Sequence, residues 1–270
     1  MKKIVALLAV LVSFNTYAWT QRAPQALQTC QVHAPYGFET TTKKLTLICR
    51  QGYLVAYDPA NKIPNNVSWT LDPVKALGCI PRTNAFVADQ SIAGGPVPDD
   101  YNGTGFDRGH AAPDGDQSWD QQVEYESFLM TNMFPQAGSL NRGVWKLLET
   151  ATRGWVVQQN ANYTIISGAI YTDADKTIGK GVRVPTSYYK IVINQKTKEI
   201  AGWQFPHVAP YPNLGNDLKS FRKPIAQIQA ASGITYKYPA GAIELAPGKE
   251  WWVDYGALTN AKRAKCGRAQ

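Results

Sequence analysis

The chain has 270 residues, of which 44% are hydrophobic and 11% aromatic, so it can bury the core of one sizeable domain or, at most, two small ones. Its formal net charge of +8 at pH 7 and its pI near 9.2 favour polyanionic partners, such as nucleic acid or an anionic membrane. These numbers exclude a chain that is too short or too polar to fold around a core of its own.

The first eighteen residues are typical of a secretory signal peptide. Lys2 and Lys3 give a positive start, residues 4–14 are apolar except for Ser13, and small residues precede a cleavage site after Ala18. About eleven apolar residues are too few for a membrane anchor. We therefore expect a secreted or periplasmic protein. Cleavage removes two lysines and no acidic residue, which lowers the net charge from +8 to +6, so the mature chain stays basic.

Four cysteines, Cys30, Cys49, Cys79 and Cys266, remain after that cleavage. An even number in an exported chain predicts two disulfides, and all three pairings are open. The spacings are wide and contain no Cys-x-x-Cys, which disfavours a zinc site. Any pairing of Cys266 would tie the basic C-terminal tail to the N-terminal half of the chain.

The expected elements follow one another in the order strands, helix, strands, helix. In chain order they are strands at 44–49, 52–57 and 69–71, an exposed loop at 90–105, a helix over 141–159, strands at 163–171, 187–194 and 200–205, and a helix over 219–232. The strands at 187–194 and 200–205 are expected to form a hairpin. This order favours one mixed α+β domain over residues 19–270, with its most secure part at about 80–205.

The stretch around His110 carries the strongest chemical signal. A lone histidine is more often structural, but Arg108 lies two residues away, on the same face if the segment is a strand. A neighbouring guanidinium lowers the pKa of an imidazole, as a general base near neutral pH requires. Gly109, between the two, allows a backbone or a substrate phosphate to approach closely. The pattern predicts that His110 is a general base.

A second stretch places Asn141 and Glu149 on the predicted helix. At 100° and 1.5 Å per residue they lie about 80° apart around the helix and about 12 Å apart along it. Asn141 could then bind a metal ion through its oxygen while Glu149 reaches a metal-bound water, an arrangement that suits Mg²⁺. The alternative is a helix cap at Asn141 and a solvated Glu149.

Together the two stretches resemble the DNA/RNA non-specific endonuclease family of secreted bacterial nucleases. The family motif Asp-Arg-Gly-His-x-Ala-Pro is matched by residues 107–113, and the signature Leu-Asn-x-Gly-x-Trp-x-x-Leu-Glu by residues 140–149. A weaker resemblance covers about 80–205, including residues 167–171 and 184–190. It implies a mixed, mainly antiparallel central sheet with flanking helices and a ββα-metal active-site motif.

The resemblance also implies roles for individual residues. His110 would activate the attacking water, Asn141 would be the only protein ligand of one Mg²⁺ (Mn²⁺ or Ca²⁺ being alternatives), and Glu149 would hold a metal-bound water. Arg108 would bind the scissile phosphate. The remaining expected site residues are Arg82 as a further family arginine, Asp107 and Asn132 as supports of the histidine loop, and Arg142 as an extra cation at a variable position.

The implied activity is endonucleolytic hydrolysis of DNA and RNA without sequence specificity, leaving 5′-phosphate ends. Two alternatives stay open: an inactive nucleic-acid-binding protein on the same fold, and a phosphodiesterase for small phosphoesters. Expected partners are DNA and RNA, with a protein inhibitor also compatible and no membrane; the chain would be a monomer or a homodimer.

Three further features have weaker readings. The basic tail with Lys262, Arg263, Lys265 and Arg268 would either extend a phosphate-binding surface or be a solvated run. His33 and His207 lack a motif and are expected to be structural, whereas Trp251-Trp252 would either stack on bases or be half core and half surface.

Overall fold

The computed structural model describes residues 30–172 and 176–267, so the expected signal peptide, its cleavage site and Arg268 lie outside the described residues. Its strands are β1 Thr46–Cys49, β2 Leu54–Asp58, β3 Ile63–Leu71, β4 Phe106–His110, β5 Met133–Ala137, β6 Tyr163–Ile170, β7 Thr177–Ile178, β8 Val182–Arg183, β9 Ser187–Asn194, β10 Glu199–Pro206 and β11 Ile243–Glu244. Its helices are α2 Pro73–Ala76, α3 Asp114–Gln117, α4 Gln121–Ser127, α5 Gly138–Leu140, α6 Lys146–Gln159, α7 Ile225–Ser232 and α8 Tyr255–Cys266.

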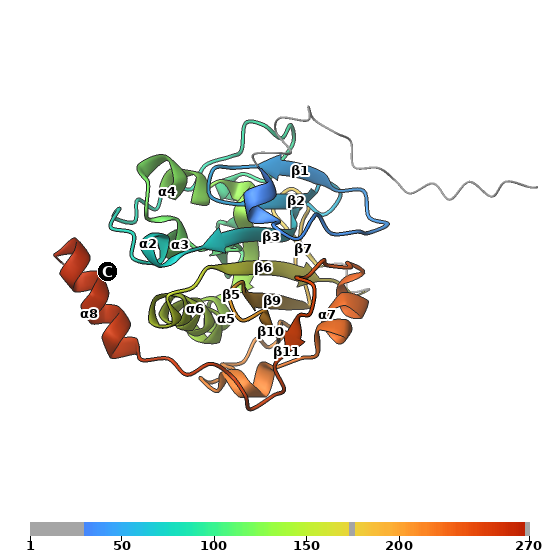
Figure 1. The fold of residues 1–270 in the computed structure, drawn as a ribbon. Coiled ribbons are helices and arrows are strands. Elements are labelled where there is room, and N and C mark those ends of the chain that lie inside the picture. The colour runs from blue at the N-terminus through green and yellow to red at the C-terminus, as the bar shows by residue number, and fades with distance from the viewer. Residues whose placement is uncertain (1–29, 173–175, 268–270) are drawn as a thin grey trace, which may run out of the picture.

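A seven-stranded sheet in the order β1-β2-β3-β6-β9-β10-β11 forms the centre of the molecule (Figure 1). All neighbouring pairs are antiparallel except β10 and β11 at one edge. Strands β9 and β10 form the expected hairpin, with Ile200 opposite Ile193. The α+β class and the mainly antiparallel sheet are therefore confirmed.

The sheet is buried on both faces in its middle, where every residue of β6 and β9 is buried. Along β6, Ile165 and Ala169 belong to the core on the side of α6, whereas Ile166 and Ile170 belong to the core on the side of α7. This alternation follows the period of two along a strand. The face beneath α6 carries the larger core, and the site is built above that face.

Strands β4 and β5 form a separate two-stranded antiparallel ribbon, with His110 opposite Met133. The indole nitrogen of Trp145, just before α6, donates a hydrogen bond to the backbone oxygen of His110 at 3.3 Å. Tyr188 of β9 donates through its hydroxyl to the oxygen of Pro135 in β5 at 2.7 Å. These bonds fix the ribbon against both the following helix and the central sheet.

Two predicted helices are wrong in their extent. The chain departs from helical geometry at Gly143 (φ −99°, ψ −121°), inside the wide turn Asn141–Trp145 that precedes helix α6. Glycine has a weak helical preference, and the distances expected from one continuous helix do not apply. The predicted helix at 219–232 is a 3₁₀ turn at Leu218–Phe221 followed by α7, because Pro224 excludes the helical conformation for the residue before it.

The disulfides are Cys30–Cys49 and Cys79–Cys266. The second joins residues 187 positions apart and ties α8 to the segment after α2, as expected for a paired Cys266. The predicted loop at 90–105 contains a 3₁₀ turn at Pro98–Tyr101. Within the described ranges, none of the helices is long and apolar enough to cross a membrane.

Candidate active site

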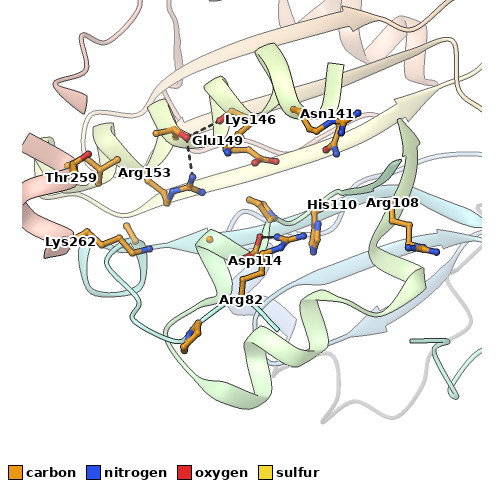
Figure 2. Close-up of a pocket in the computed structure, with 17 residues that line it drawn as sticks. Arg82, Arg108, His110, Asp114, Asn141, Lys146, Glu149, Arg153, Thr259 and Lys262 are labelled. Carbon is orange, nitrogen blue, oxygen red and sulfur yellow. Dashed lines mark hydrogen bonds and ion pairs between the residues drawn. The ribbon is translucent and has the colours of Figure 1, made fainter. Parts of the chain in front are cut away.

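A cleft of about 670 Å³ runs between helix α6 on one side and the end of β4 with α3 on the other (Figure 2). The segment after α2 and one face of α8 complete its lining. Eight charged residues line it, six of them cationic: Arg82, Arg108, Arg142, Lys146, Arg153, Lys262, Asp114 and Glu149. The excess of cations suits a polyanionic ligand.

His110 ends β4 and lies in the wall of this cleft, where it is only 6% exposed. Its ring packs edge-on against Phe128, with ring centres 4.9 Å apart, and is tilted against Phe86 at 5.8 Å. No group of the described chain forms a hydrogen bond with its Nε2. The aromatic rings orient the imidazole and leave this nitrogen for a ligand.

Burial is the main reason that the pKa of His110 is lowered to about 4. Asp114 opposes this shift and Arg82 adds to it. The expected direction is right, but the expected cause is wrong. Arg108 donates instead to the oxygens of Pro98 and Asn102, at 3.0 and 2.7 Å. A neutral imidazole at neutral pH can accept a proton.

Asn132 holds the loop that follows His110. Its side-chain oxygen accepts from the amide of Ala112 at 2.9 Å, and its side-chain nitrogen donates to the oxygens of Ala112 and Ser127 at 2.9 and 2.8 Å. The Asn132 backbone oxygen also accepts from the amide of Ala111. The side chain is fully buried, so each of these bonds replaces a bond to water.

Gly109 allows a close approach within the protein, and the group that approaches it is a side chain, that of Gln136. A Cβ at this position would clash with the side-chain amide of Gln136 on the paired strand β5. Gln136 is fully buried, so it cannot move away into solvent. The glycine therefore lets β4 and β5 pair with Gln136 between them.

Asn141 lies on the other side of the cleft from His110 (Figure 2). Its side-chain nitrogen donates to Asp107 Oδ2 at 3.0 Å, and the same oxygen lies 3.3 Å from Nε of Arg142. Asp107 thus contacts the turn before α6, whereas the resemblance suggested that it supports the histidine loop. The bond fixes the Asn141 amide and leaves its oxygen available as an acceptor. Arg142 is 75% exposed at the rim.

Glu149 is not the solvated helix residue of the alternative reading, because its side chain is 12% exposed in the cleft wall. Burial raises its pKa to about 7, against the opposing effect of Lys190 and Arg153. Lys190 lies beneath it with Nζ 3.8 Å from the carboxylate, and packs between the rings of Trp69 and Trp145. A buried carboxylate of this kind gains from a nearby cation.

The donors in this cleft fit a hard divalent cation held mainly by water. In the described parts of the chain no three His, Cys, Asp or Glu side chains cluster so that they could hold a metal ion by themselves. The fixed amide oxygen of Asn141 and the Glu149 carboxylate are both hard oxygen donors, which Mg²⁺ prefers with few protein ligands.

Three charged residues of the cleft were missed from the sequence. Lys146 and Arg153 flank Glu149 at spacings of three and four, which put all three on one face of α6, so helical periodicity could have found them. Asp114 follows the histidine motif directly and forms an ion pair with Arg82. Arg82, placed only by its distance from the motif, does line the cleft.

The ribbon β4–β5 followed by α6 is the ββα-metal arrangement, which defines a class of nucleases. Residues 31–241 match the sequence model of the DNA/RNA non-specific endonuclease family, and the chain belongs to this family. A nuclease of Nostoc sp. is 31% identical over 73% of this chain and 76% of that one. The mitochondrial endonuclease G of Homo sapiens is 31% identical over 69% of this chain and 68% of its own.

A crystal structure of the EndoG/EndoGI complex, on the mechanism of EndoG inhibition, contains a chain with the same fold. The TM-score is 0.66 at 25% sequence identity, and the match covers 80% of this chain and 93% of the other.

Proposed function

We propose that this chain is an exported, divalent-metal-dependent endonuclease that hydrolyses DNA and RNA without sequence specificity and leaves 5′-phosphate ends. One observation supports the chemistry most directly. The buried, neutral His110, with an unbonded Nε2, lies across a cationic cleft from Asn141 and Glu149. Mg²⁺ is the proposed ion, and the basic charge and sequence of the leader support export.

In the proposed reaction, His110 Nε2 takes a proton from a water molecule as its oxygen attacks the phosphorus. The bond between phosphorus and the 3′ oxygen breaks, the 3′ oxygen gains a proton from solvent, and the phosphate stays on the 5′ end. His110 then releases its proton to solvent, which restores the base. The Asn141 oxygen and, through a water, the Glu149 carboxylate would hold a divalent cation, which would supply Lewis-acid stabilisation of the developing negative charge. The low pKa of His110 ensures that the base is unprotonated before the attack.

The arginines of the cleft are proposed to bind the substrate phosphates. Arg108 is positioned by the oxygens of Pro98 and Asn102 and by the ring of Phe86, 5.2 Å from its guanidinium carbon. Arg82 is positioned by Asp114 and by the ring of Phe128. Arg142 at the rim has the freedom to follow a flexible strand. Planar guanidinium groups suit paired hydrogen bonds to phosphate oxygens.

The cleft disfavours the two alternative functions. Cations spread from Arg142 at one end to Lys262 on α8 suit a polymer better than a small phosphoester. The residues that an inactive binding protein would have lost, His110, Asn141 and Arg108, are present. A protein inhibitor remains part of the proposal, since the solved EndoG structure is a complex with EndoGI.

The test is cleavage of supercoiled plasmid and of RNA by the purified mature chain, with magnesium or with chelator. We expect magnesium-dependent cleavage of both, and a loss of about a thousandfold in rate for His110→Ala, the scale of general-base catalysis. His33→Gln is the matched control, because His33 is buried, does not line the cleft and bonds to the Gln51 backbone. Metal-independent or absent cleavage would refute the proposal.

A further inference from the structure

Helix α8 forms one end of the cleft, although it lies beyond the residues that match the family, which end at 241. Leu258, Thr259 and Lys262 of this helix line the same cleft as His110. Figure 2 shows Lys262 reaching from α8 into the cleft toward Arg153. A part of the substrate path is thus built from a segment outside the family match.

Both ends of α8 are anchored, each to a different wall of the cleft. Next to its first turn, the amide of Asp254 donates to the side chain of Gln158 on α6 at 3.0 Å. At its last turn, Cys266 is bonded to Cys79, and Lys265 donates to the Val74 oxygen of α2 at 2.9 Å. The helix therefore bridges α6 and the segment that contains α2 (Figure 1).

Few apolar contacts hold this helix in place, because Leu258 is its only buried residue. An isolated helix of twelve residues is marginal in water, and most helical stability in proteins comes from packing. The position of α8 consequently depends on its anchors, of which the Cys79–Cys266 disulfide is the only covalent one among the described residues.

The inner face of α8 presents one uncommitted cation. Leu258, Lys262 and Cys266 are four residues apart and share that face. Lys265 is used on the Val74 oxygen and Arg263 is exposed. Lys262 forms no hydrogen bond or ion pair with the described residues. Burial and Arg153 lower its pKa, against the opposing effect of Asp116 and Asp114. Arg153 is already paired with Asp116 at 2.7 Å, so the cation left to bind an anion at this point is Lys262, and a bound anion would favour its charged form.

We propose that α8 is a phosphate-binding wall, on which Lys262, with Thr259 beside it, binds a phosphate of the nucleic-acid strand beyond the scissile one. The Cys79–Cys266 disulfide holds this wall in position. The proposal rests on the proposed function, because it assigns to α8 the affinity for a polymeric substrate of the same site. A substrate with a single phosphodiester at His110 would not contact α8. A longer strand that continues along the cleft would contact it.

The proposed phosphate contact can be tested by measuring DNA binding without cleavage. A fluorescein-labelled DNA oligonucleotide is titrated with the His110→Ala protein in chelator, and its anisotropy is measured at several salt concentrations. We expect Lys262→Gln to weaken binding about fivefold and to reduce the slope of log affinity against log salt by about one, as loss of one phosphate contact does. Arg263→Gln, with the same loss of charge on the outer face of the same helix, should keep the affinity and the slope of its parent. Equal effects of the two substitutions would overturn the proposal.

The anchor is tested with cysteine pairs in the same assay. We expect the double variant Cys79→Ser/Cys266→Ser to bind DNA as weakly as Lys262→Gln does. The control double variant, Cys30→Ser/Cys49→Ser, should bind with the affinity of its parent. Unchanged binding in the first double variant would refute the anchoring role of the disulfide. The binding assay needs neither metal nor cleavage. If the wild type fails to cleave, the proposed function falls, while a selective effect of Lys262→Gln would still show a nucleic-acid-binding wall.

Discussion

At the scale of single residues, the environment of His110 couples its chemistry to stability. The aromatic rings of Phe86 and Phe128 keep the imidazole dry, and burial lowers its pKa from 6.5 to about 4. The same burial makes protonation of the folded protein costly. The unfolded chain, in which the histidine is solvated, binds the proton more readily between these two pKa values.

This difference predicts a specific pH dependence of stability. As pH falls from 6.5 toward 4, the unfolded state takes up a proton that folded His110 refuses, so the free energy of unfolding decreases. Between about pH 7 and about pH 5 the contribution of His110 should be about 2 kcal/mol. In His110→Asn, urea unfolding at the two pH values should show a decrease smaller by that amount. An equal decrease in both proteins would contradict the assigned pKa.

The Asn132 side chain positions the loop that follows His110. Asn132→Ala leaves the amide and oxygen of Ala112 and the oxygen of Ser127 without their partners inside the protein. We expect the free energy of unfolding to fall by about 3 kcal/mol, and kcat of the folded fraction to fall about tenfold because the histidine loop shifts. Urea unfolding and rates corrected for the folded fraction check both. A loss of stability with wild-type kcat would show that the loop does not position His110.

At the scale of elements, the ribbon β4–β5 sets where His110 lies. Gly109→Ala would drive a methyl group into the Gln136 side chain, which is fully buried. We expect a loss of about 2 kcal/mol, typical of overpacking, together with a lower kcat. A second substitution, Gln136→Ala, should restore part of both in the double variant, because it makes room for the methyl group. Additive losses in the double-mutant cycle would mean that Gly109 matters for another reason.

The sequence predicted elements where one local rule decides the structure. The two expected strands at 187–194 and 200–205, separated by a short turn, predicted the β9–β10 hairpin, and the two motifs indicated the residues that meet in the cleft. Helical periodicity failed at Gly143 and Pro224, where backbone preferences override the apolar pattern. The cause of the His110 pKa was also missed, since burial by Phe128 depends on tertiary packing that spacing along the chain does not contain.

At the scale of the whole molecule, the cleft joins four segments that are distant in sequence: the stretch after α2, the end of β4 with α3, α6, and α8. Motif spacing could indicate the second and third of these. The contribution of α8 depends on which cysteine Cys266 joins, and three pairings were equally open from the sequence. One disulfide therefore determines whether the basic tail is a solvated run or a wall of the site, and for Lys262 the structure favours the wall.

A helix held by anchors and one buried leucine should unfold separately from the sheet. Hydrogen exchange of the oxidised protein should show protected amides in α8, and selective reduction of Cys79–Cys266 should speed their exchange by about a hundredfold or more. Amides of β6 and β9, in the middle of a sheet buried on both faces, should keep their protection. If only α8 detaches on reduction, His110, Asn141 and Glu149 keep their positions while the cleft loses its α8 wall. Binding of long nucleic-acid strands should then weaken under reducing conditions. Equal acceleration in α8 and the central strands would instead show that the disulfide stabilises the whole domain, and unchanged exchange in α8 would show that packing alone holds the helix.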